Sequence, residues 1–293
     1  MLHFRPLYLK NMSAKKEAIE VHKDELGSIG VDLATFDNLN EYLHVAHRDN
    51  HYMFIIQQTG YFLWELDFNE INQTGPSVSF VAPGQMHRYL DVKECSGWLV
   101  FVDNELVPVQ YREIFTSCLN LKQVAAVDHD EAAFKILPLL VEMLKEESQP
   151  LYKSVIRSMI ETLAGIMATR ILLSQNLMPY IGGTKYNTVV TFKQLVGEKI
   201  KESKQVQEYA SLLNISPLYL NEIVKQITGF PASYWINQEI LLEAKRMLYY
   251  TTLDVKQIAY ELGYEDHAYF SRFFKKNTAM TALEFRNLKP LII

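Results

Sequence analysis

Cysteine is scarce in this chain, a large excess of one charge is absent, and so is any long apolar run. Only two of the 293 residues are cysteines, Cys95 and Cys118, which is too few for a disulfide framework or a zinc cluster. A length of 293 residues suggests about two domains. A net charge of −5 with 48% apolar residues is typical of an ordinary folded protein, not of one that holds nucleic acid by bulk charge. No run of about 18 apolar residues occurs, and the first residues lack a secretory apolar segment. These absences favour a cytoplasmic protein that spans no membrane.

The last hundred residues contain a helix-turn-helix pattern twice. In the second copy, Asp254 can cap a short helix that Gly263 ends, and Asp266 can cap the helix that follows. We expect Tyr269 and its neighbouring phenylalanines to supply apolar contacts, which leaves a polar and basic face for DNA. The residues predicted on that face are His267, Ser271, Arg272, Lys275 and Lys276.

The first copy lies about fifty residues earlier. Residues 206–213 form a short helix, Asn214 and Ile215 make the turn, and Ser216 and Pro217 begin the next helix with a capping hydroxyl and a first-turn proline. The residues predicted to meet DNA from this copy are Ser216, Leu218, Asn221, Glu222 and Lys225.

One uninterrupted amphipathic helix, from about residue 233 to residue 250, joins the two copies. About 17 helical residues span roughly 25 Å. With both half-motifs added, the two recognition helices can lie about one DNA turn, roughly 34 Å, apart. The spacing therefore predicts that both helices address the same face of one duplex.

Four segments resemble the AraC/XylS family of bacterial transcription regulators, over roughly residues 190 to 289. They are Ile258-Ala-Tyr-Glu-Leu-Gly-Tyr-Glu-Asp-His-Ala-Tyr-Phe-Ser-Arg-Phe-Phe-Lys-Lys276, Glu284-Phe-Arg286, Leu213-Asn-Ile-Ser-Pro-Leu-Tyr-Leu220 and Glu243-Ala-Lys-Arg-Met-Leu248. By similarity, the positions that meet bases or phosphates are Leu218, Asn221, Glu222, His267, Ala268, Ser271 and Arg272. The resemblance also implies pairing with a second subunit to form a homodimer.

Four positions depart from the family pattern. Glu222 and Ile240 stand where the family usually has arginine, and Ala279 and Ala282 replace a habitual glycine and proline. A carboxylate that faces DNA repels phosphate, although it can accept a hydrogen bond from cytosine N4. We therefore expect the second copy to bind DNA more strongly than the first, unless Glu222 reads a cytosine.

The first part of the chain has the alternation of short strands, in segments rich in aromatic and branched residues separated by turn formers. The expected strands are Tyr42–His47, Tyr52–Gln57, Tyr61–Leu66, Val78–Ala82 and Trp98–Val102. Their spacing predicts a small β-barrel or jelly roll. The order of His51, Gly60, Gly75-Pro76 and Pro83-Gly84-Gln-Met-His87 resembles the cupin-like effector domain that often precedes this DNA-binding domain.

Two kinds of ligand are conceivable in such a barrel. Cupin enzymes hold metals with histidines and a carboxylate, and this segment has His44, His47, His51 and His87, but the usual His-x-His pair is missing. We therefore predict no metal and no cofactor, and favour a pocket for an organic effector. Its predicted lining residues are Tyr42, Trp64, His87, Tyr89 and Trp98; ordinary barrel core is the alternative role for these side chains.

Two helical stretches follow, from residue 132 to about 147 and from residue 151 to about 175. The second carries a broad apolar surface, which we expect to pair in part with a second subunit; burial wholly within one subunit is the alternative. Its members are Val155, Ile156, Met159, Ile160, Leu163, Ile166, Met167 and Ile171. The segment from Asn176 to Val190 contains a proline and two glycines and indicates an interdomain linker.

The predicted fold class is α+β, with an N-terminal cupin-like β-barrel, helices that follow it, and a C-terminal all-α domain with two helix-turn-helix motifs. The predicted domains are an effector domain at 1–130, a helical dimerisation region at 131–178, a linker at 179–190 and a DNA-binding domain at 191–293.

The predicted function is ligand-linked transcription control by a protein that is not an enzyme. Its expected partners are double-stranded DNA, a small-molecule effector, RNA polymerase and a second copy of the chain. Two alternatives remain open: a metal-dependent cupin enzyme with a helical appendage, and an architectural DNA-binding protein without an effector.

Overall fold

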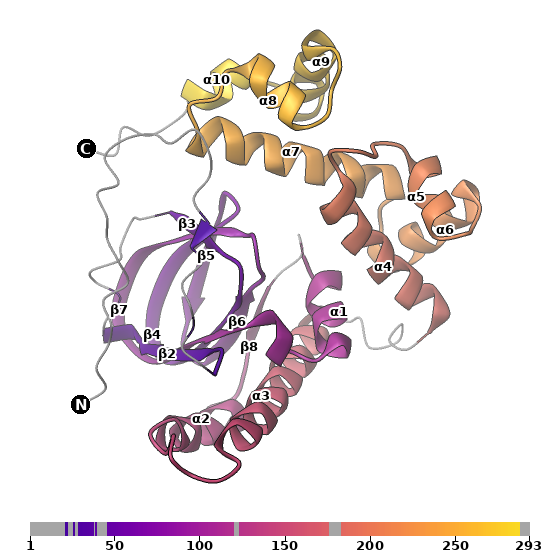
Figure 1. Cartoon of the computed structure of the whole chain (residues 1–293). Helices are drawn as coiled ribbons and strands as arrows, with labels where there is room; N and C mark the ends of the chain where they lie inside the picture. Colours follow the sequence, from indigo (N-terminus) through magenta and orange to yellow (C-terminus); the bar gives the residue numbers. More distant parts are fainter. Residues whose placement is uncertain are drawn as a thin grey trace. The chain divides into compact units, whose positions relative to one another are not determined.

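The computed structural model describes residues 21–22, 26, 29–37, 39, 46–119, 123–175 and 183–287. Its described residues fall into two compact units, which separate between Thr191 and Phe192. The first unit is an antiparallel sheet with helices and the second is entirely helical, so the predicted α+β class is confirmed (Figure 1). Within these ranges, no helix has the length and apolar character needed to span a bilayer.

The first unit is centred on a long two-stranded ribbon of β4 (Tyr52–Leu66) and β7 (Met86–Val102), paired antiparallel along its length. Register shifts interrupt the pairing near Thr59, where β-bulges increase twist and bending. A Cβ atom on Gly60 would lie 2.3 Å from the carbonyl oxygen of Glu94, and one on Gly97 would lie 2.0 Å from that of Ile56. Only glycine fits these two positions, so the ribbon bends here without breaking.

The remaining strands pair with one half or the other of this ribbon. β6 (Ser77–Val81) pairs with the first half of β4, and β5 (Asn69–Thr74) pairs with its second half. β8 (Val124–Ala126) extends the sheet beyond β6. β2 (Val31–Thr35) and β3 (His47–Asp49) pair with the two halves of β7, and β1 (Val21–His22) pairs with β3 in parallel. The strands curve around a common interior (Figure 1). Gly60 was expected between two separate strands, but it lies inside the single strand β4.

The two faces of the sheet are both apolar because successive side chains of β4 point to opposite sides. Met53 and Ile55 pack in the barrel interior, whereas Phe54 and Ile56 pack against the helices on the outer face. The inner cluster is made of Phe36, Leu39, Met53, Ile55, Phe62, Trp64, Leu66, Val81, Tyr89, Leu99 and Val124. Side chains therefore fill the interior of this small barrel.

The outer face is covered by a short 3-10 helix (Asn104–Leu106) and by α1 (Val109–Ser117), α2 (Ala132–Met143) and α3 (Tyr152–Gln175). The broad apolar surface of α3 is mostly buried inside this unit, since α3 packs on β6, β8, α1 and α2. Val155 stays exposed, and Met159 and Ile166 are partly buried. Most of this apolar surface therefore packs within the chain, and pairing of the remainder with a second subunit stays a prediction.

The second unit consists of seven helices among the described residues, from α4 (Thr184–Lys199), which crosses the boundary between the units, to α10 (Ala282–Asn287). The expected irregular linker at 179–190 is helical from Thr184 onward, and residues 176–182 lie outside the described ranges. The Tyr186 hydroxyl lies 2.9 Å from Ser117 Oγ, which ties the start of α4 to α1. Val189 and Val190 are also buried, so this segment has the apolar contacts that a helix needs.

Candidate functional site

The first helix-turn-helix consists of α5 (Val206–Leu212) and α6 (Pro217–Thr228). Asn214 adopts a positive φ of 54° in the turn, and Ser216 caps α6 by accepting a hydrogen bond from the Tyr219 amide at 3.1 Å. Pro217 occupies the first turn, where its missing N–H costs nothing. Gly229 ends α6 in the left-handed conformation. The turn at Asn214, the cap by Ser216 and the first-turn proline agree with the sequence-based interpretation.

The second helix-turn-helix consists of α8 (Val255–Glu261) and α9 (His267–Thr278). Asp254 and Gln257 form a capping box at the start of α8. The Asp266 carboxylate accepts a hydrogen bond from the Ala268 amide at 2.7 Å and so fixes the start of α9. Backbone and side chain therefore define where the second recognition helix begins.

The helix that joins the two motifs, α7 (Ala232–Tyr250), has 19 residues and is thus about 28 Å long. Its apolar face is buried along its whole length. At its far end, the guanidinium of Arg286 on α10 donates hydrogen bonds to the carbonyls of Leu248 at 3.0 Å and Leu253 at 2.5 Å. Arg286 thereby fastens α10 to the exit of α7.

A direct contact also links the two motifs. The Lys204 ammonium, just before α5, donates to the carbonyls of Lys201 and Gly263, and it lies 5.1 Å from the centre of the Tyr264 ring. Gly263 comes so close that a Cβ atom there would lie 1.9 Å from the carbonyl oxygen of Lys201. The turn of the second motif is therefore packed against the segment that leads into the first.

Most of the residues predicted to face DNA are solvent-exposed. The exposed members are Ser216, Leu218, Glu222, Lys225, His267, Arg272, Lys275 and Lys276. Leu218 is 70% exposed on the outer face of α6, where an apolar side chain gains nothing from water. On α9 the basic side chains recur at helical spacing, so they form a single cationic face.

Three members of the predicted set are only partly exposed. Asn221 differs from the expectation, because its Oδ1 accepts a hydrogen bond from the Ala232 amide at 3.0 Å and thus caps α7. Ser271 Oγ donates to the His267 carbonyl at 2.9 Å within α9, and Ala268 is half-buried. The oxygen of Asn221 is already engaged in holding the joining helix.

Tyr269 was expected to pack inward but is 58% exposed. It lies three residues before Arg272 and seven before Lys276, so it shares their face of α9. The helical spacing alone could have placed it there. An exposed aromatic ring beside cationic side chains can contact a thymine methyl group or the sugar backbone.

Two carboxylates moderate the charge of this surface. Asp266 lies 3.7 Å from the Arg272 guanidinium, in a pair that is well exposed on both sides and contributes little to stability. Glu222 is exposed on α6, three residues before the exposed Lys225. The cationic character is therefore concentrated on α9.

The described residues among those predicted to line an effector pocket do not all lie on one face of the sheet. Trp64 is fully buried and donates a 2.6 Å hydrogen bond to Gln73 Oε1, and Tyr89 donates to Met53 Sδ. Trp98 packs against the helices on the opposite face of the sheet, because alternation along β7 turns it away from the interior. Tyr42 lies outside the described residues.

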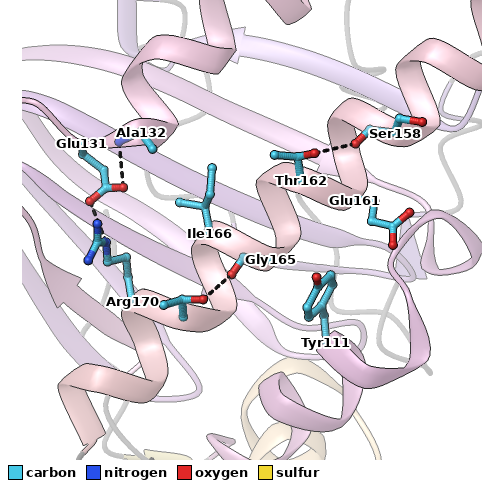
Figure 2. Close-up of a pocket in the computed structure, with 10 residues that line it drawn as sticks. Tyr111, Glu131, Ala132, Ser158, Glu161, Thr162, Gly165, Ile166 and Arg170 are labelled. Carbon is cyan, nitrogen blue, oxygen red and sulfur yellow. Dashed lines mark hydrogen bonds and ion pairs between the residues drawn. The ribbon is translucent and has the colours of Figure 1, made fainter.

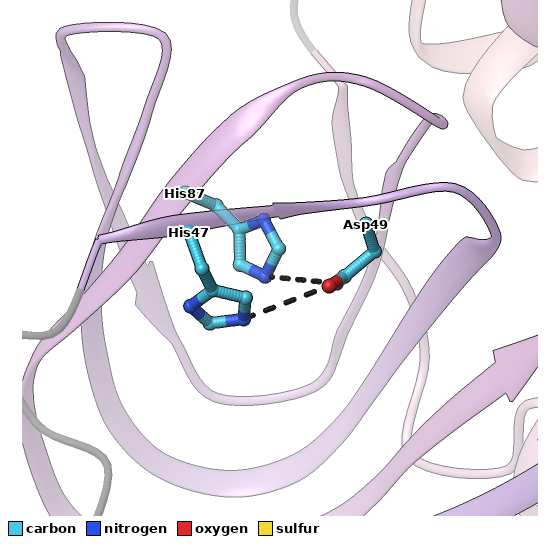
Figure 3. A group of neighbouring side chains, drawn as sticks. All are labelled: His47, Asp49 and His87. Atoms are coloured by element: carbon cyan, nitrogen blue, oxygen red, sulfur yellow. Dashed lines mark ion pairs between the residues drawn. The ribbon is translucent and has the colours of Figure 1, made fainter. Parts of the chain in front are cut away.

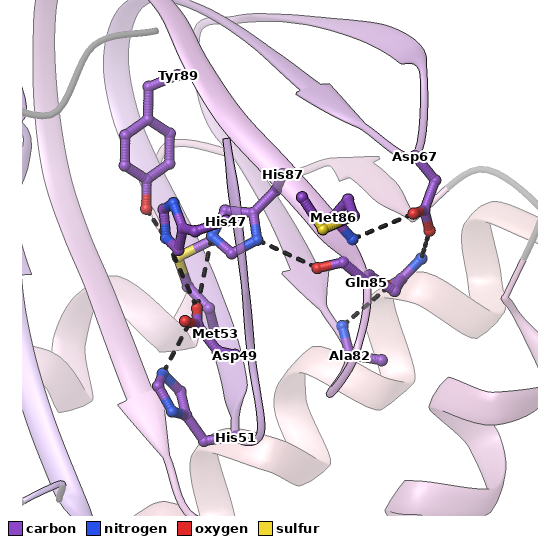
Figure 4. Close-up of polar contacts among 10 residues, drawn as sticks. All are labelled: His47, Asp49, His51, Met53, Asp67, Ala82, Gln85, Met86, His87 and Tyr89. Atoms are coloured by element: carbon purple, nitrogen blue, oxygen red, sulfur yellow. Dashed lines mark hydrogen bonds and ion pairs between the residues drawn. The ribbon is translucent and has the colours of Figure 1, made fainter. Parts of the chain in front are cut away.

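His87 is the polar member of that set inside the barrel, and it is 1% exposed. Burial, reinforced by the nearby His47, lowers the pKa of His87 to about 3. Burial also raises the pKa of Tyr89, with a further contribution from the Asp49 carboxylate. Both side chains are therefore neutral at physiological pH. Figure 4 shows them together with Asp49, His47 and His51.

A pocket of about 680 Å³ lies elsewhere, on the outer side of α3 (Figure 2). Its lining mixes apolar and polar groups, with Tyr111 on one side and the 2.7 Å ion pair between Glu131 and Arg170 on the other. None of the residues predicted for effector binding contributes to it.

Comparison with known proteins gives a family match in the second unit, where residues 209–288 match a family described as "Helix-turn-helix domain". The chain is 28% identical over 94 residues to the arabinose operon regulatory protein of Escherichia coli (strain K12), which is 32% of each chain. It is 39% identical over 77 residues to the uncharacterized transcriptional regulatory protein YesN of Bacillus subtilis (strain 168), which is 26% of this chain and 21% of the relative.

Among solved structures, the C-terminal domain of AraT, a response regulator from Geobacillus stearothermophilus, is 27% identical. The match covers 36% of this chain and 87% of that domain, with a TM-score of 0.34. The chain spans about a third of the length of the first curated relatives that it matches. Those relatives are regulatory proteins, and they give no support to the alternative of an enzyme.

Proposed function

Because the C-terminal part of this chain is a helix-turn-helix domain of the AraC type, we propose that the protein is a sequence-specific DNA-binding transcription regulator. In this proposal α6 and α9 enter successive major grooves on one face of a duplex. The pair of capped helix-turn-helix motifs is the observation that supports this proposal most. The 19-residue α7 and the contact between Lys204 and Gly263 join the two motifs.

The side chains divide into two kinds of contact. Lys275, Lys276 and Arg272 on α9 bind phosphates or guanine edges, and such cations dominate affinity and its salt dependence. Leu218 and Tyr269 supply apolar surface to the bases. Because α6 carries Glu222, α9 provides the larger share of the affinity.

Regulation by a small molecule is the second part of the proposal. A ligand of the first unit controls transcription if it binds two arrangements of the protein with different affinity. Homodimerisation and contact with RNA polymerase belong to the same proposal. Sedimentation equilibrium of the full chain, with and without operator DNA, measures homodimerisation directly.

Genome-wide mapping of DNA bound in cells tests the main proposal and supplies the operator. The full chain should then shift an operator fragment in a gel, with an affinity that falls steeply as salt increases. A scrambled fragment of the same length is the control. Equal affinity for both fragments, or no bound sites in cells, would rule out sequence-specific regulation.

A further inference from the structure

Three histidines surround the carboxylate of Asp49 at one end of the barrel. Asp49 Oδ2 lies 3.5 Å from His87 Nε2, 3.9 Å from His47 Nε2 and 3.8 Å from His51 Nε2. His47, Asp49 and His87 each present one ligand atom, and all of these atoms lie within 4.8 Å of one another (Figure 3). Asp49 and His87 are 7% and 1% exposed, so the centre of the group is shielded from water.

Strand geometry brings these side chains together. His47 on β3 is the cross-strand partner of His87 on β7, and their ring centres are 4.3 Å apart. Asp49 lies two residues after His47 and so points to the same face of β3. The Gly84 amide donates to the Asp49 carbonyl at 2.7 Å and fixes the end of this strand. The arrangement is held by backbone pairing rather than by the side chains themselves.

The separations are too long for hydrogen bonds between these groups. They are close to the roughly 3.4 Å that separates two ligand atoms at tetrahedral angles, each about 2.1 Å from one zinc ion. A shared cation between the atoms accounts for such distances, whereas direct pairing would bring them nearer.

His87 shows the clearest need for a ligand. Its Nδ1 lies 3.4 Å from the carbonyl oxygen of Gln85, the side on which a metal-binding histidine commonly donates its N–H. Its Nε2 is buried, has no hydrogen-bond partner in the described part of the chain, and faces the Asp49 carboxylate. With Nδ1 protonated, a bare lone pair points at an anion, which is unfavourable unless a cation lies between them.

We propose that His47, Asp49 and His87 bind a divalent first-row transition metal, with His51 placed to supply a further imidazole. Imidazole and carboxylate donors suit Zn²⁺ and Fe²⁺ better than the hard cations Mg²⁺ and Ca²⁺, which prefer all-oxygen sites. This revises the expectation of a metal-free barrel. The His-x-His pair is replaced by His47-x-Asp49, which supplies the carboxylate from the same strand.

The proposal does not depend on DNA binding, because metal binding is measured on the full chain alone. The chain is stripped with a chelator and dialysed, then titrated with Co²⁺ while visible absorption is recorded, and with Zn²⁺ in a calorimeter. We expect one ion per chain and, by X-ray absorption of the zinc-loaded protein, an N/O shell with imidazole scattering. No saturable binding, or a shell without imidazole, would overturn the proposal.

Variants identify the ligands. His87→Ala and Asp49→Asn should each weaken Co²⁺ binding by at least roughly 100-fold. Loss of a side chain that only orients a metal ligand costs up to about 100-fold in affinity, and loss of a ligand itself should cost no less. His129→Ala is the matched control, since His129 is exposed and outside the group; it should bind as the wild type does. If His87→Ala and Asp49→Asn fold and retain wild-type affinity, the assignment is wrong. If these variants do not fold, the number of ions bound per wild-type chain and the imidazole scattering in its X-ray absorption spectrum test the proposal instead.

Discussion

At the scale of single residues, the exposed faces of α6 and α9 combine cations with two carboxylates that oppose them. Arg272, Lys275 and Lys276 point outward from α9, and Asp266 and Glu222 lie at the start of α9 and on α6. Asp266 also caps α9, whereas no cap, ion pair or hydrogen bond is described for the side chain of Glu222. Glu222 is therefore the carboxylate whose removal tests the surface most cleanly.

Glu222→Arg should raise affinity for operator and scrambled DNA alike, since it replaces a charge that repels phosphate by one that attracts it. The salt slope of binding should become steeper by about 1 to 2 for the added phosphate contact and the lost repulsion. Fluorescence anisotropy over a salt series measures both quantities. Glu222→Gln removes the negative charge without adding a positive one. Its DNA affinity and salt slope should therefore lie between those of the wild type and those of Glu222→Arg.

A different result would also be informative. If Glu222→Arg lowers operator affinity while scrambled DNA binds more tightly, Glu222 reads a cytosine. Unchanged affinity for both fragments would place Glu222 away from the interface.

Ala279 occupies a backbone conformation that suits glycine. It ends α9 with φ of 61°, the left-handed region, and is exposed. Ala279→Gly should therefore raise the free energy of unfolding by about 1 kcal/mol, because an L-residue pays roughly that amount here. Urea denaturation followed by circular dichroism measures it. A loss of stability would contradict the account of this helix end.

Sequence predicted most of the exposed residues of α6 and α9, because helical periodicity sorts inner from outer positions, but Tyr269 was assigned to the inner side and is exposed. The sequence could not predict the cap that Asn221 gives to α7, since the partner amide at Ala232 lies eleven residues away beyond a turn. Asp49 was missed for a similar reason: its neighbour His87 is brought close only by the pairing of β3 with β7.

At the scale of elements, the turn of the second motif is a structural junction as well as a helix end. Gly263 has φ of 75°, and the Lys201 carbonyl occupies the space that a side chain would need. Gly229, at the equivalent end of α6, has φ of 81° but open space around it. Both glycines have a left-handed backbone, but only Gly263 would bring a side chain into a steric clash. Substitutions at the two positions therefore separate the cost of backbone strain from the cost of the clash.

Gly263→Ala should lower the free energy of unfolding by roughly 3 kcal/mol or more, since it combines left-handed strain with a clash against backbone. Gly229→Ala is the matched control and should cost only about 1 kcal/mol. Urea denaturation of both variants compares them. Equal losses would show that the Lys201 contact does not constrain the motif.

Sequence placed the helices of the second unit well, because caps, prolines and glycines mark their ends. It was less successful with the sheet. β5 and the first half of β7 lack the apolar alternation of a half-buried strand, and Gly60 suggested a turn that pairing with β7 overrides. Trp98 was assigned to the interior because its side of β7 depends on a register that bulges shift.

At the scale of the whole molecule, two units carry separate chemistry in one chain. The first unit, Val21–Thr191, contains the filled barrel and the histidine group around Asp49; the second, from Phe192, contains both helix-turn-helix motifs. The length of the chain predicted two domains, since a single domain usually has about 100 to 200 residues. What the first unit binds depends on side chains that only the folded sheet brings together.

The most direct measurement of the central claim is a hydroxyl-radical footprint of the full chain on its operator, compared with the double variant Arg272→Ala/Lys275→Ala. The wild type should protect two patches about one helical turn, roughly 10.5 base pairs, apart on one face of the duplex. The double variant should lose the patch under α9, whereas Lys135→Ala/Arg157→Ala, with the same charge change on exposed residues of the first unit, should keep both. A single patch in the wild type, or two patches that survive the loss of Arg272 and Lys275, would contradict the account.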